Sequence, residues 1–435
     1  MSRMRVNLGR ARLAGEDGIR LPSMVPVLQS FASEGIDPQQ IEQKIRDEFG
    51  KPDIRGRIRP GMRIAIGVGS RGIDELARIV QSVVRELKAL GAQPFIVPAM
   101  GSHGGASAEG QAELLAGYGI RERLLGVPIR SSMDTIRLGE VADGVEVYFD
   151  RLAYEQADGI VAVARIKPHT DFKASIESGI LKMLGIGFGK HKGAAHLHRF
   201  GMERFGTLLP EVGKLVIERT PFLFGIGIVE DASHRTAHIE AVPGNCLPSR
   251  EEELLVMAKR LMPRIWLDDI DVLVVDEIGK NISGCGMDPN VIGRSGAMRR
   301  FGDGPAVRRI VVRGLTEDTK GNAVGIGLAD FTTRRVAERI DYAAMYTNVI
   351  TAMDVSGGKL PLVMTDDRTA LFAAVSTIGM RAPHEARIVR IRHTLELRHI
   401  HVSENMMAEA EAHPMMEPAG EPAAWRFDAR GHLAD

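Results

Sequence analysis

Short apolar runs alternate with longer amphipathic stretches along this chain, and that order restricts the folds open to it. Residues 62–69 and 94–101 are apolar and end in glycine, which predicts buried strands. Residues 74–90 between them carry apolar side chains at helical spacing and stop at Gly91, a residue type that often ends helices. Residues 107–119 predict the next helix. Strands that alternate with helices predict a parallel, doubly wound sheet.

The same alternation starts again near Ile270. Residues 268–278, 308–315 and 385–394 predict strands, and residues 333–340 and 369–379 predict helices. We therefore predict an α/β protein with two Rossmann-like domains, residues 1–268 and residues 269–435. The Ala-, Glu- and Pro-rich end of the second domain predicts a short helix and then a loosely held polar tail.

Composition narrows the partners and the compartment. Lys+Arg and Asp+Glu number 56 each, so no net charge attracts nucleic acid or an anionic membrane. Two cysteines, Cys246 and Cys285, indicate no disulfide framework and fit a reducing compartment. No apolar run is long enough to cross a bilayer, and the first residues lack the apolar core of a signal peptide. We expect a cytoplasmic protein that binds neither nucleic acid nor membrane.

A glycine-rich turn follows the first predicted strand. Residues 67–72, "GVGSRG", match the G-x-G-x-x-G pattern, in which glycines let the backbone approach a phosphate. Arg71 would add a bidentate phosphate contact, and Gly69, Ser70 and Gly72 would line the same cofactor site. The next strand does not end in the acidic residue that a nicotinamide dinucleotide site requires. A phosphate site and a plain strand-to-helix turn both remain open.

Two histidines directly follow predicted strands. His103 lies in the glycine-rich "AMGSHGG" after residues 94–101, and His169 lies in "KPH" after the strand at 159–166. Ligands of parallel α/β sheets gather at the carboxyl ends of the strands, and imidazole exchanges protons near neutral pH. Two histidines at one sheet edge would suit a racemase that works on both faces of a carbon atom. Two unrelated loop histidines are the alternative.

A lysine and three further histidines follow His169 closely. Lys182 lies in the apolar stretch "ESGILKMLGIGFG", where partial burial would lower its pKa and free its amine as a covalent anchor. The spacing alone is explained more simply by a lysine whose aliphatic part packs on apolar surface while its amine stays in water. His191, His196 and His198 lie in "GKHKGAAHLHRFG". The spacing of these histidines does not provide a clear metal site with three protein ligands. The sequence fits better with a single histidine that binds a metal carried by a cofactor.

The first strand of the second domain is followed by a polar, glycine-rich loop. Residues 276–294 carry Lys280, Asn281 and Arg294, which would bind a substrate carboxylate if the loop faces the edge of the first sheet. Cys285 in the same loop has no recognisable histidine partner, and we interpret it as a small loop residue.

Together these motifs resemble the lactate racemase superfamily, the nickel-pincer-nucleotide enzymes that racemise or epimerise 2-hydroxy acids. The similarity runs over about residues 60–315 and includes "AMGSHGG", "KPH", the lysine that follows it, "HLHRFG" and "DEIGKNISG". The stretch "IESGILKMLGIGFGKHKGA" is similar to a branch distinct from the lactate racemase archetype. The resemblance implies two α/β domains with the active-site cleft between them.

The resemblance also implies residue roles. His103 and His169 match the paired acid/base histidines, and Lys182 matches the lysine that holds the cofactor through a thioamide bond. His198 matches the histidine that ligates nickel, with His196 as the alternative. Arg71 matches an arginine near the cofactor phosphate. Lys280 and Asn281 match the part of the second domain that reaches into the active site. The implied cofactor is the nickel-pincer nucleotide, nickel bound to pyridinium-3,5-bisthiocarboxylic acid mononucleotide.

The chain departs from the archetype in two places. "GSRG" stands where the archetype has an Asp-x-Thr-Arg-type loop, so only the arginine matches. The interval from His169 to Lys182 is longer, which leaves Lys173 and Lys190 as further candidates for the covalent lysine. The implied activity is an isomerase that acts on a 2-hydroxy acid by reversible hydride transfer. A nicotinamide-dependent dehydrogenase and a non-catalytic nucleotide- or phosphate-binding protein are the alternatives. The sequence indicates no oligomeric interface.

Overall fold

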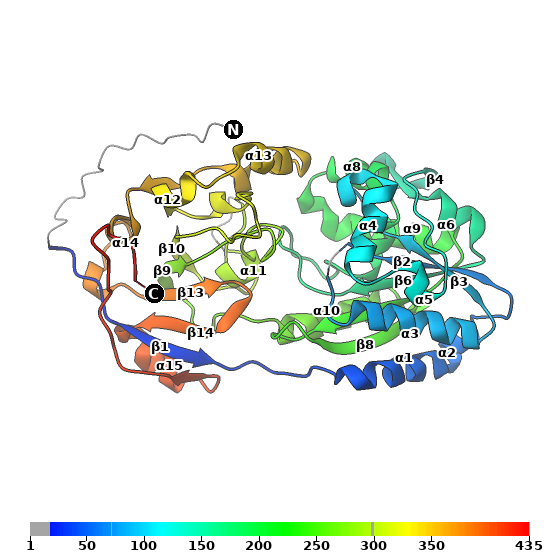
Figure 1. Cartoon of the computed structure of the whole chain (residues 1–435), viewed down its shortest axis with the longest axis horizontal. Coiled ribbons are helices and arrows are strands. Elements are labelled where there is room, and N and C mark those ends of the chain that lie inside the picture. Colours follow the sequence, from blue (N-terminus) through cyan, green and yellow to red (C-terminus); the bar gives the residue numbers. More distant parts are fainter. Residues whose placement is uncertain (1–17, 71, 297–299, 435) are drawn as a thin grey trace. The chain divides into compact units, whose positions relative to one another are not determined.

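The chain forms two compact units. The computed structural model describes residues 18–70, 72–296 and 300–434. Unit 2 is Ala32–Met262, whereas residues 18–31 join residues 263–434 in unit 1 (Figure 1). The chain therefore passes between the units twice, and unit 2 is an insertion within unit 1. The second passage lies close to the predicted boundary between residues 268 and 269. Residues 18–31 of the predicted first domain instead belong to unit 1, because the strand at Met24–Gln29 pairs with residues 399–403.

Unit 2 is built on a five-stranded sheet with the order β3-β2-β6-β7-β8. Strands β3, β2, β6 and β7 are parallel, and β8 pairs antiparallel with β7. Their bounds are β2 Arg63–Val68, β3 Gln93–Pro98, β6 Gly159–Arg165, β7 Phe222–Glu230 and β8 Thr236–Pro243. A separate antiparallel pair, β4 (Thr135–Val141) and β5 (Val145–Asp150), lies outside this sheet.

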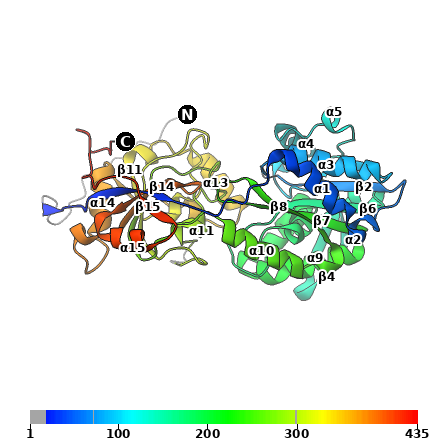
Figure 2. The ribbon, with the colours of Figure 1, turned by 90° about the horizontal axis from the view of Figure 1, so that it is seen from below.

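Helices cover both faces of the unit 2 sheet, as a doubly wound fold requires. One face packs against α1 (Ile41–Gly50), α3 (Leu76–Ala89) and α4 (Ala108–Gly117). The other packs against α9 (Phe205–Arg219) and α10 (Ser249–Leu261), so the two sets lie on opposite sides of β2, β6 and β7 (Figure 2). The shorter helices are α2 Pro52–Arg55, α5 Glu122–Leu125, α6 Arg151–Gln156, α7 Ile180–Lys182 and α8 Lys190–His198.

Local sequence explains why these helices begin and end where they do. The predicted helix 74–90 is confirmed as α3, which is followed by Gly91 at a φ of +81°. The predicted helix 107–119 is confirmed as α4, and the Ser107 hydroxyl caps it by accepting the Gly110 N–H at 3.0 Å. In the described part of the chain, no helix is both long and apolar enough to cross a membrane.

Unit 1 is built on an eight-stranded mixed sheet with the order β12-β11-β10-β9-β13-β14-β1-β15. Strands β12 to β13 in this order are parallel, and the remaining pairings are antiparallel. The strands are β1 Met24–Gln29, β9 Ile270–Val275, β10 Val307–Val312, β11 Phe331–Thr333, β12 Leu362–Met364, β13 Ile388–His393, β14 Glu396–Ser403 and β15 Met416–Pro418. The helices are α11 Pro289–Ile292, α12 Arg334–Ala337, α13 Tyr342–Thr351, α14 Asp367–Val375 and α15 Met407–Ala412.

The C-terminal segment is held tightly, which differs from the loosely held tail that its composition predicted. The predicted short helix is confirmed as α15, but β15 then pairs with β1. The indole of Trp425 donates to the Pro22 carbonyl at 3.0 Å. The backbone of Leu433 donates to Asp367 at 2.9 Å and accepts from Arg313 at 3.2 Å. Partners far away in the sequence therefore order a segment whose own composition is polar.

Candidate active site

The carboxyl edge of the unit 2 sheet collects three of the predicted site positions. Strand β2 lies between β3 and β6, and all three run parallel. Ser70 follows β2, His103 follows β3 and His169 follows β6. Both histidines therefore leave the sheet at the same edge, on the strands that flank β2.

His103 lies in an exposed turn that is fixed through its backbone. Its Nδ1 shares a short hydrogen bond with the Ser70 hydroxyl. The buried side chain of Gln111 donates to the carbonyls of Gly101 at 3.0 Å and His103 at 3.2 Å. Gly104 has a φ of +65°, and a Cβ there would collide with the backbone of α4. These contacts hold His103 at the sheet edge while its side chain stays accessible.

His169 is buried, with 7% of its surface exposed. Its Nδ1 accepts the Asp171 N–H at 3.1 Å, and its ring packs on Phe172 with 4.4 Å between the centroids. Its main-chain N–H donates to Glu177 at 2.6 Å. Burial first, and then the charges of nearby lysines led by Lys182, lower the pKa of His169 well below its usual value. The imidazole is therefore neutral at physiological pH, which is the form that accepts a proton.

Lys182 lies where an α-helical turn changes into a π-helical turn. Helix α7 (Ile180–Lys182) leads into a π-helical turn at Met183–Gly187, and α8 (Lys190–His198) follows. Such turns are rare and are frequently found at functional sites. Lys182 is half-buried, and its Nζ lies 3.4 Å from the Ser178 hydroxyl.

A carboxylate from α10 caps the start of this helical segment. Glu251 accepts the Leu181 N–H at 3.0 Å, and its other oxygen lies against Gly179, where any side chain would collide with it. Burial raises the pKa of Glu251 to about 7, although hydrogen bonds from the N–H groups of Leu181 and Ile180 oppose that shift. Glu251 was not predicted from the sequence, because its partners are about seventy residues away.

The two histidines near the end of α8 face different neighbours. His198 packs on Phe205, with 5.1 Å between the ring centroids, and burial followed by the charge of Lys182 lowers its pKa. His196 instead uses its Nε2 to accept the Glu146 N–H of β5 at 3.1 Å. The charge of Lys182 therefore acts on His198, whereas the ring of His196 is bonded to β5.

The structure brings His169, Lys182 and His198 together. The Lys182 ammonium lowers the pKa of both histidines, and His198 itself contributes to the lowered pKa of His169. Two aromatic rings link the imidazoles, because Phe172 packs on His169, Phe205 packs on His198, and the two phenyl centroids are 5.7 Å apart. We call these three residues the His–Lys–His group.

The loop of His103 and the turn after β2 both pack on the π-helical turn. The Gly101 N–H donates to the Gly187 carbonyl at 3.1 Å. Gly67 faces the Phe188 ring so closely that a Cβ would overlap it, and Gly69 faces the same helical segment. Helix packing therefore explains these two glycines of the "GVGSRG" motif without a phosphate.

The start of α3, which a phosphate would approach, holds carboxylates. The Asp74 N–H donates to Glu230 at 2.9 Å, and the Asp74 carboxylate accepts the Thr236 N–H at 2.9 Å. Negative side chains at this helix end oppose a bound phosphate and do not favour the nicotinamide alternative. Gly72 lies just before this segment, and Arg71 lies outside the residues that the structure describes.

The two other candidates for the covalent lysine form ion pairs. Lys190 is fully buried and pairs with the equally buried Asp150 at 2.9 Å. Lys173 donates to the buried carboxylate of Glu177 at 3.2 Å. Both amines are therefore engaged by carboxylates within unit 2.

The predicted substrate-binding residues belong to unit 1. Lys280 donates to a carbonyl of its own loop at 2.9 Å, and Asn281 accepts the Thr316 hydroxyl at 2.7 Å. Arg294 is buried, donates to Asp330 at 2.7 Å and also donates to two carbonyls of β10. Arg294 therefore has ionic and backbone partners inside unit 1, and its contact with a substrate carboxylate stays a prediction.

Metal binding by the protein alone finds no support in the described residues. Across residues 18–70, 72–296 and 300–434, no three His, Cys, Asp or Glu side chains form a group that could hold a metal ion. The His–Lys–His group instead offers neutral imidazoles beside one amine. Such a donor set suits a metal that arrives with most of its ligands on a cofactor.

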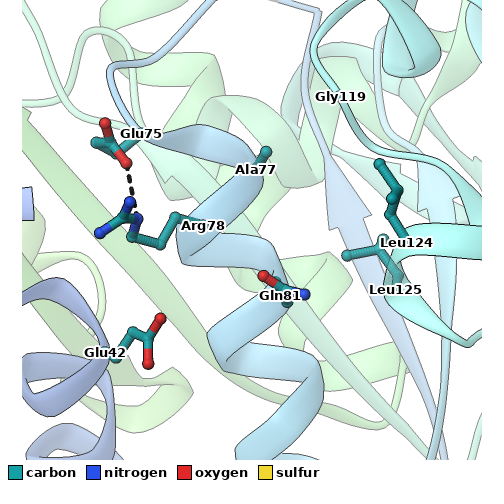
Figure 3. Close-up of a pocket in the computed structure, with 8 residues that line it drawn as sticks. All are labelled: Glu42, Glu75, Ala77, Arg78, Gln81, Gly119, Leu124 and Leu125. Carbon is teal, nitrogen blue, oxygen red and sulfur yellow. Dashed lines mark ion pairs between the residues drawn. The ribbon is translucent and has the colours of Figure 1, made fainter. Parts of the chain in front are cut away.

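A surface hollow of about 440 Å³ lies elsewhere on unit 2. Its lining comes from α1, α3 and residues 119–125, and its charged side chains include Glu75 and Arg78, which pair at 2.9 Å (Figure 3). The lining shares no residue with the His–Lys–His group, and we assign no role to this hollow.

Comparisons with known proteins bear on the fold. No family model and no curated protein sequence matches the chain. Among solved structures, the lactate racemase apoprotein of Thermoanaerobacterium thermosaccharolyticum is similar, with a TM-score of 0.53 and 14% identity over 85% of this chain and 93% of that one. A protein of Thermotoga maritima matches 66% of the chain at 12% identity, 72% of its own length and a TM-score of 0.48. The chain therefore has a two-domain α/β fold similar to that of lactate racemase.

Proposed function

We propose that this protein is an isomerase that racemises or epimerises a 2-hydroxy acid. The observation that carries the proposal is the His–Lys–His group of unit 2, at the sheet edge that also bears His103. Similarity of fold to lactate racemase adds support for the reaction class. The group supplies a lysine amine, a buried neutral imidazole and a second imidazole, which are the groups that such a reaction needs.

The residues present fit the nickel-pincer nucleotide. Lys182 would hold the cofactor covalently, and His198 would give nickel its one protein ligand; the lowered pKa of His198 keeps its ring neutral and able to bind a metal. We propose no phosphate contact for the "GVGSRG" turn, because the carboxylates at the start of α3 oppose a bound phosphate there. When bound, this cofactor supplies a hydride acceptor.

The two predicted acid/base histidines would move the hydroxyl proton of the substrate. His169, neutral because of its burial, would accept that proton from one enantiomer, and His103 would serve the other. The ammonium groups of Lys182 and Lys167 act on His169, and we propose that they help to hold the substrate carboxylate.

The first test is the chirality of single-enantiomer 2-hydroxy acids after incubation with protein from cells that make the cofactor. We expect one or more acids to lose optical purity, and solvent deuterium to stay largely out of the α-position. Extensive deuterium wash-in would indicate proton abstraction from carbon and contradict the hydride route. Retention of optical purity across the panel, by protein that contains nickel, would contradict the proposed reaction.

The second test is the intact mass of the same preparation. We expect an added mass that maps to Lys182 and is lost in Lys182→Arg, a variant that keeps the positive charge but lacks a nucleophilic amine. A mass that persists in Lys182→Arg would move the covalent role to another lysine.

A further inference from the structure

The loop that carries His169 closes on itself and encloses a carboxylate. Lys167 and Ser178 exchange two backbone hydrogen bonds, at 3.0 and 3.2 Å, and so form the neck of the loop. Glu177, next to that neck, points inward, and its side chain has no exposed surface. A buried carboxylate is costly unless several donors surround it.

Four donors surround the Glu177 carboxylate. Its Oε2 accepts the His169 N–H at 2.6 Å and the Lys173 ammonium at 3.2 Å. Its Oε1 accepts the Ala174 N–H at 3.4 Å and pairs with Lys259 of α10 at 2.8 Å. Lys173 also donates to the His169 carbonyl at 3.0 Å. Glu177 and the lysine bound to it therefore hold both main-chain polar groups of His169.

We infer that Glu177 is a positioning residue for His169. The inference rests on the proposed role of His169 in proton exchange. The ring is linked to the main chain two residues later through the Asp171 N–H, so a carboxylate that fixes the main chain also fixes the imidazole. A displacement of about 1 Å in a reacting group costs on the order of 100-fold in rate.

The kinetic test compares Glu177→Gln with a matched control. Glutamine has the same shape, but its amide nitrogen would face a donor, so it cannot accept all four hydrogen bonds. Glu252→Gln is the control, because Glu252 accepts a hydrogen bond from Ser175 of the same loop at 2.8 Å. We expect kcat of Glu177→Gln to fall roughly 10- to 100-fold with KM nearly unchanged, and Glu252→Gln to match wild type. Equal losses in both variants, or a change confined to KM, would overturn the inference.

A spectroscopic test separates this inference from the proposed reaction. In the full-length protein labelled with ¹⁵N-histidine, the ring signals of His169 and His103 are assigned by their loss in His169→Gln and His103→Gln. We expect Glu177→Gln to shift the His169 signals and leave the His103 signals in place. Unmoved His169 signals would overturn the inference even if the protein is an active isomerase. If the His169 signals shift but the protein has no isomerase activity, the inference that Glu177 positions His169 is supported and the proposed function is contradicted.

A second variant tests the inference in case Glu177→Gln does not fold. Lys259→Met removes one of the two cations that hold Glu177 and leaves the carboxylate in place. We expect a smaller displacement of the His169 ring signals than in Glu177→Gln, with a matching smaller fall in kcat. Signals and kcat that both equal wild type would count against the inference.

Discussion

At the scale of single residues, the two predicted acid/base histidines have unlike surroundings. His103 is exposed and shares a hydrogen bond with Ser70, whereas His169 is buried against Phe172. A buried ring contributes packing as well as chemistry, so the two positions respond differently to the same substitution.

His103→Gln and His169→Gln should each lower kcat by about 100- to 10,000-fold, because general acid–base groups contribute on that order. Only His169→Gln should also lower the melting temperature, because it replaces a buried ring. Steady-state kinetics and calorimetry check both expectations. Full activity in either variant would exclude that histidine from proton transfer.

The two histidines of α8 allow a matched test of metal binding. His198→Ala should abolish nickel retention in protein from cofactor-producing cells, because the charge of Lys182 acts on His198 and we propose His198 as the nickel ligand. His196→Ala should keep its nickel, since His196 bonds to the backbone of β5. Elemental analysis after desalting measures both. Nickel lost from His196→Ala alone would reverse the assignment.

The sequence could predict which residue types follow which strands, and therefore the candidates His103, His169 and Lys182. It could not separate His198 from His196, because the difference lies in tertiary neighbours: His196 bonds to β5, and His198 packs on Phe205. Glu177 was missed for a similar reason. Its partners span a loop and a helix eighty-two residues later in the chain. A lone carboxylate between Ile176 and Ser178 was the only sequence signal available.

At the scale of secondary-structure elements, the cap of the helix that carries Lys182 should depend on pH. The pKa of Glu251 is about 7 in the folded protein, against a usual 4.5, so ionised Glu251 destabilises the fold. Stability that the protonated carboxyl contributes is fully present below about pH 4.5 and is lost as the pH rises through 7.

Glu251→Gln keeps a carbonyl oxygen for the Leu181 N–H and cannot ionise. Relative to wild type, its free energy of unfolding should rise between pH 4.5 and pH 8, by up to about 3 kcal/mol. Denaturant unfolding followed by circular dichroism at several pH values measures the difference. Glu253→Gln, at an exposed position of the same helix, controls for removal of a carboxyl group. A difference between Glu251→Gln and wild type that stays constant with pH would contradict the expectation.

Elements with strong local signals were predictable, and elements defined by distant partners were not. Helices α3 and α4 carry their own periodicity and end signals, so they match the sequence prediction closely. Strands β1 and β15 owe their place to each other and to β14. Nothing within a short window of sequence marks such a pairing, which explains the error at the start of the first predicted domain.

At the scale of the whole molecule, the last residues should stabilise unit 1. Deleting residues 428–435 removes the Leu433 backbone that meets the buried charges of Arg313 and Asp367. We expect a loss of about 2 to 4 kcal/mol in the free energy of unfolding of unit 1, the cost of leaving buried polar groups without partners.

Fluorescence can follow that loss within unit 1 alone. The chain has two tryptophans, Trp266 and Trp425, and both belong to unit 1 and survive the deletion. Arg430→Ala, at an exposed position of the removed segment, is the control and should unfold like wild type. A truncated chain whose fluorescence transition stays at the wild-type denaturant concentration would show that the terminal contacts contribute nothing.

The insertion of unit 2 between β1 and the rest of unit 1 has a consequence for biosynthesis. During translation, β1 leaves the ribosome before the whole of unit 2, and its neighbours β14 and β15 leave it only after unit 2. The inserted unit is continuous in sequence and is free to acquire its structure while the rest is still being made. Strand β1 must wait, unpaired, until β14 and β15 have been made, and a chain stalled before then would expose it to chaperones or to aggregation.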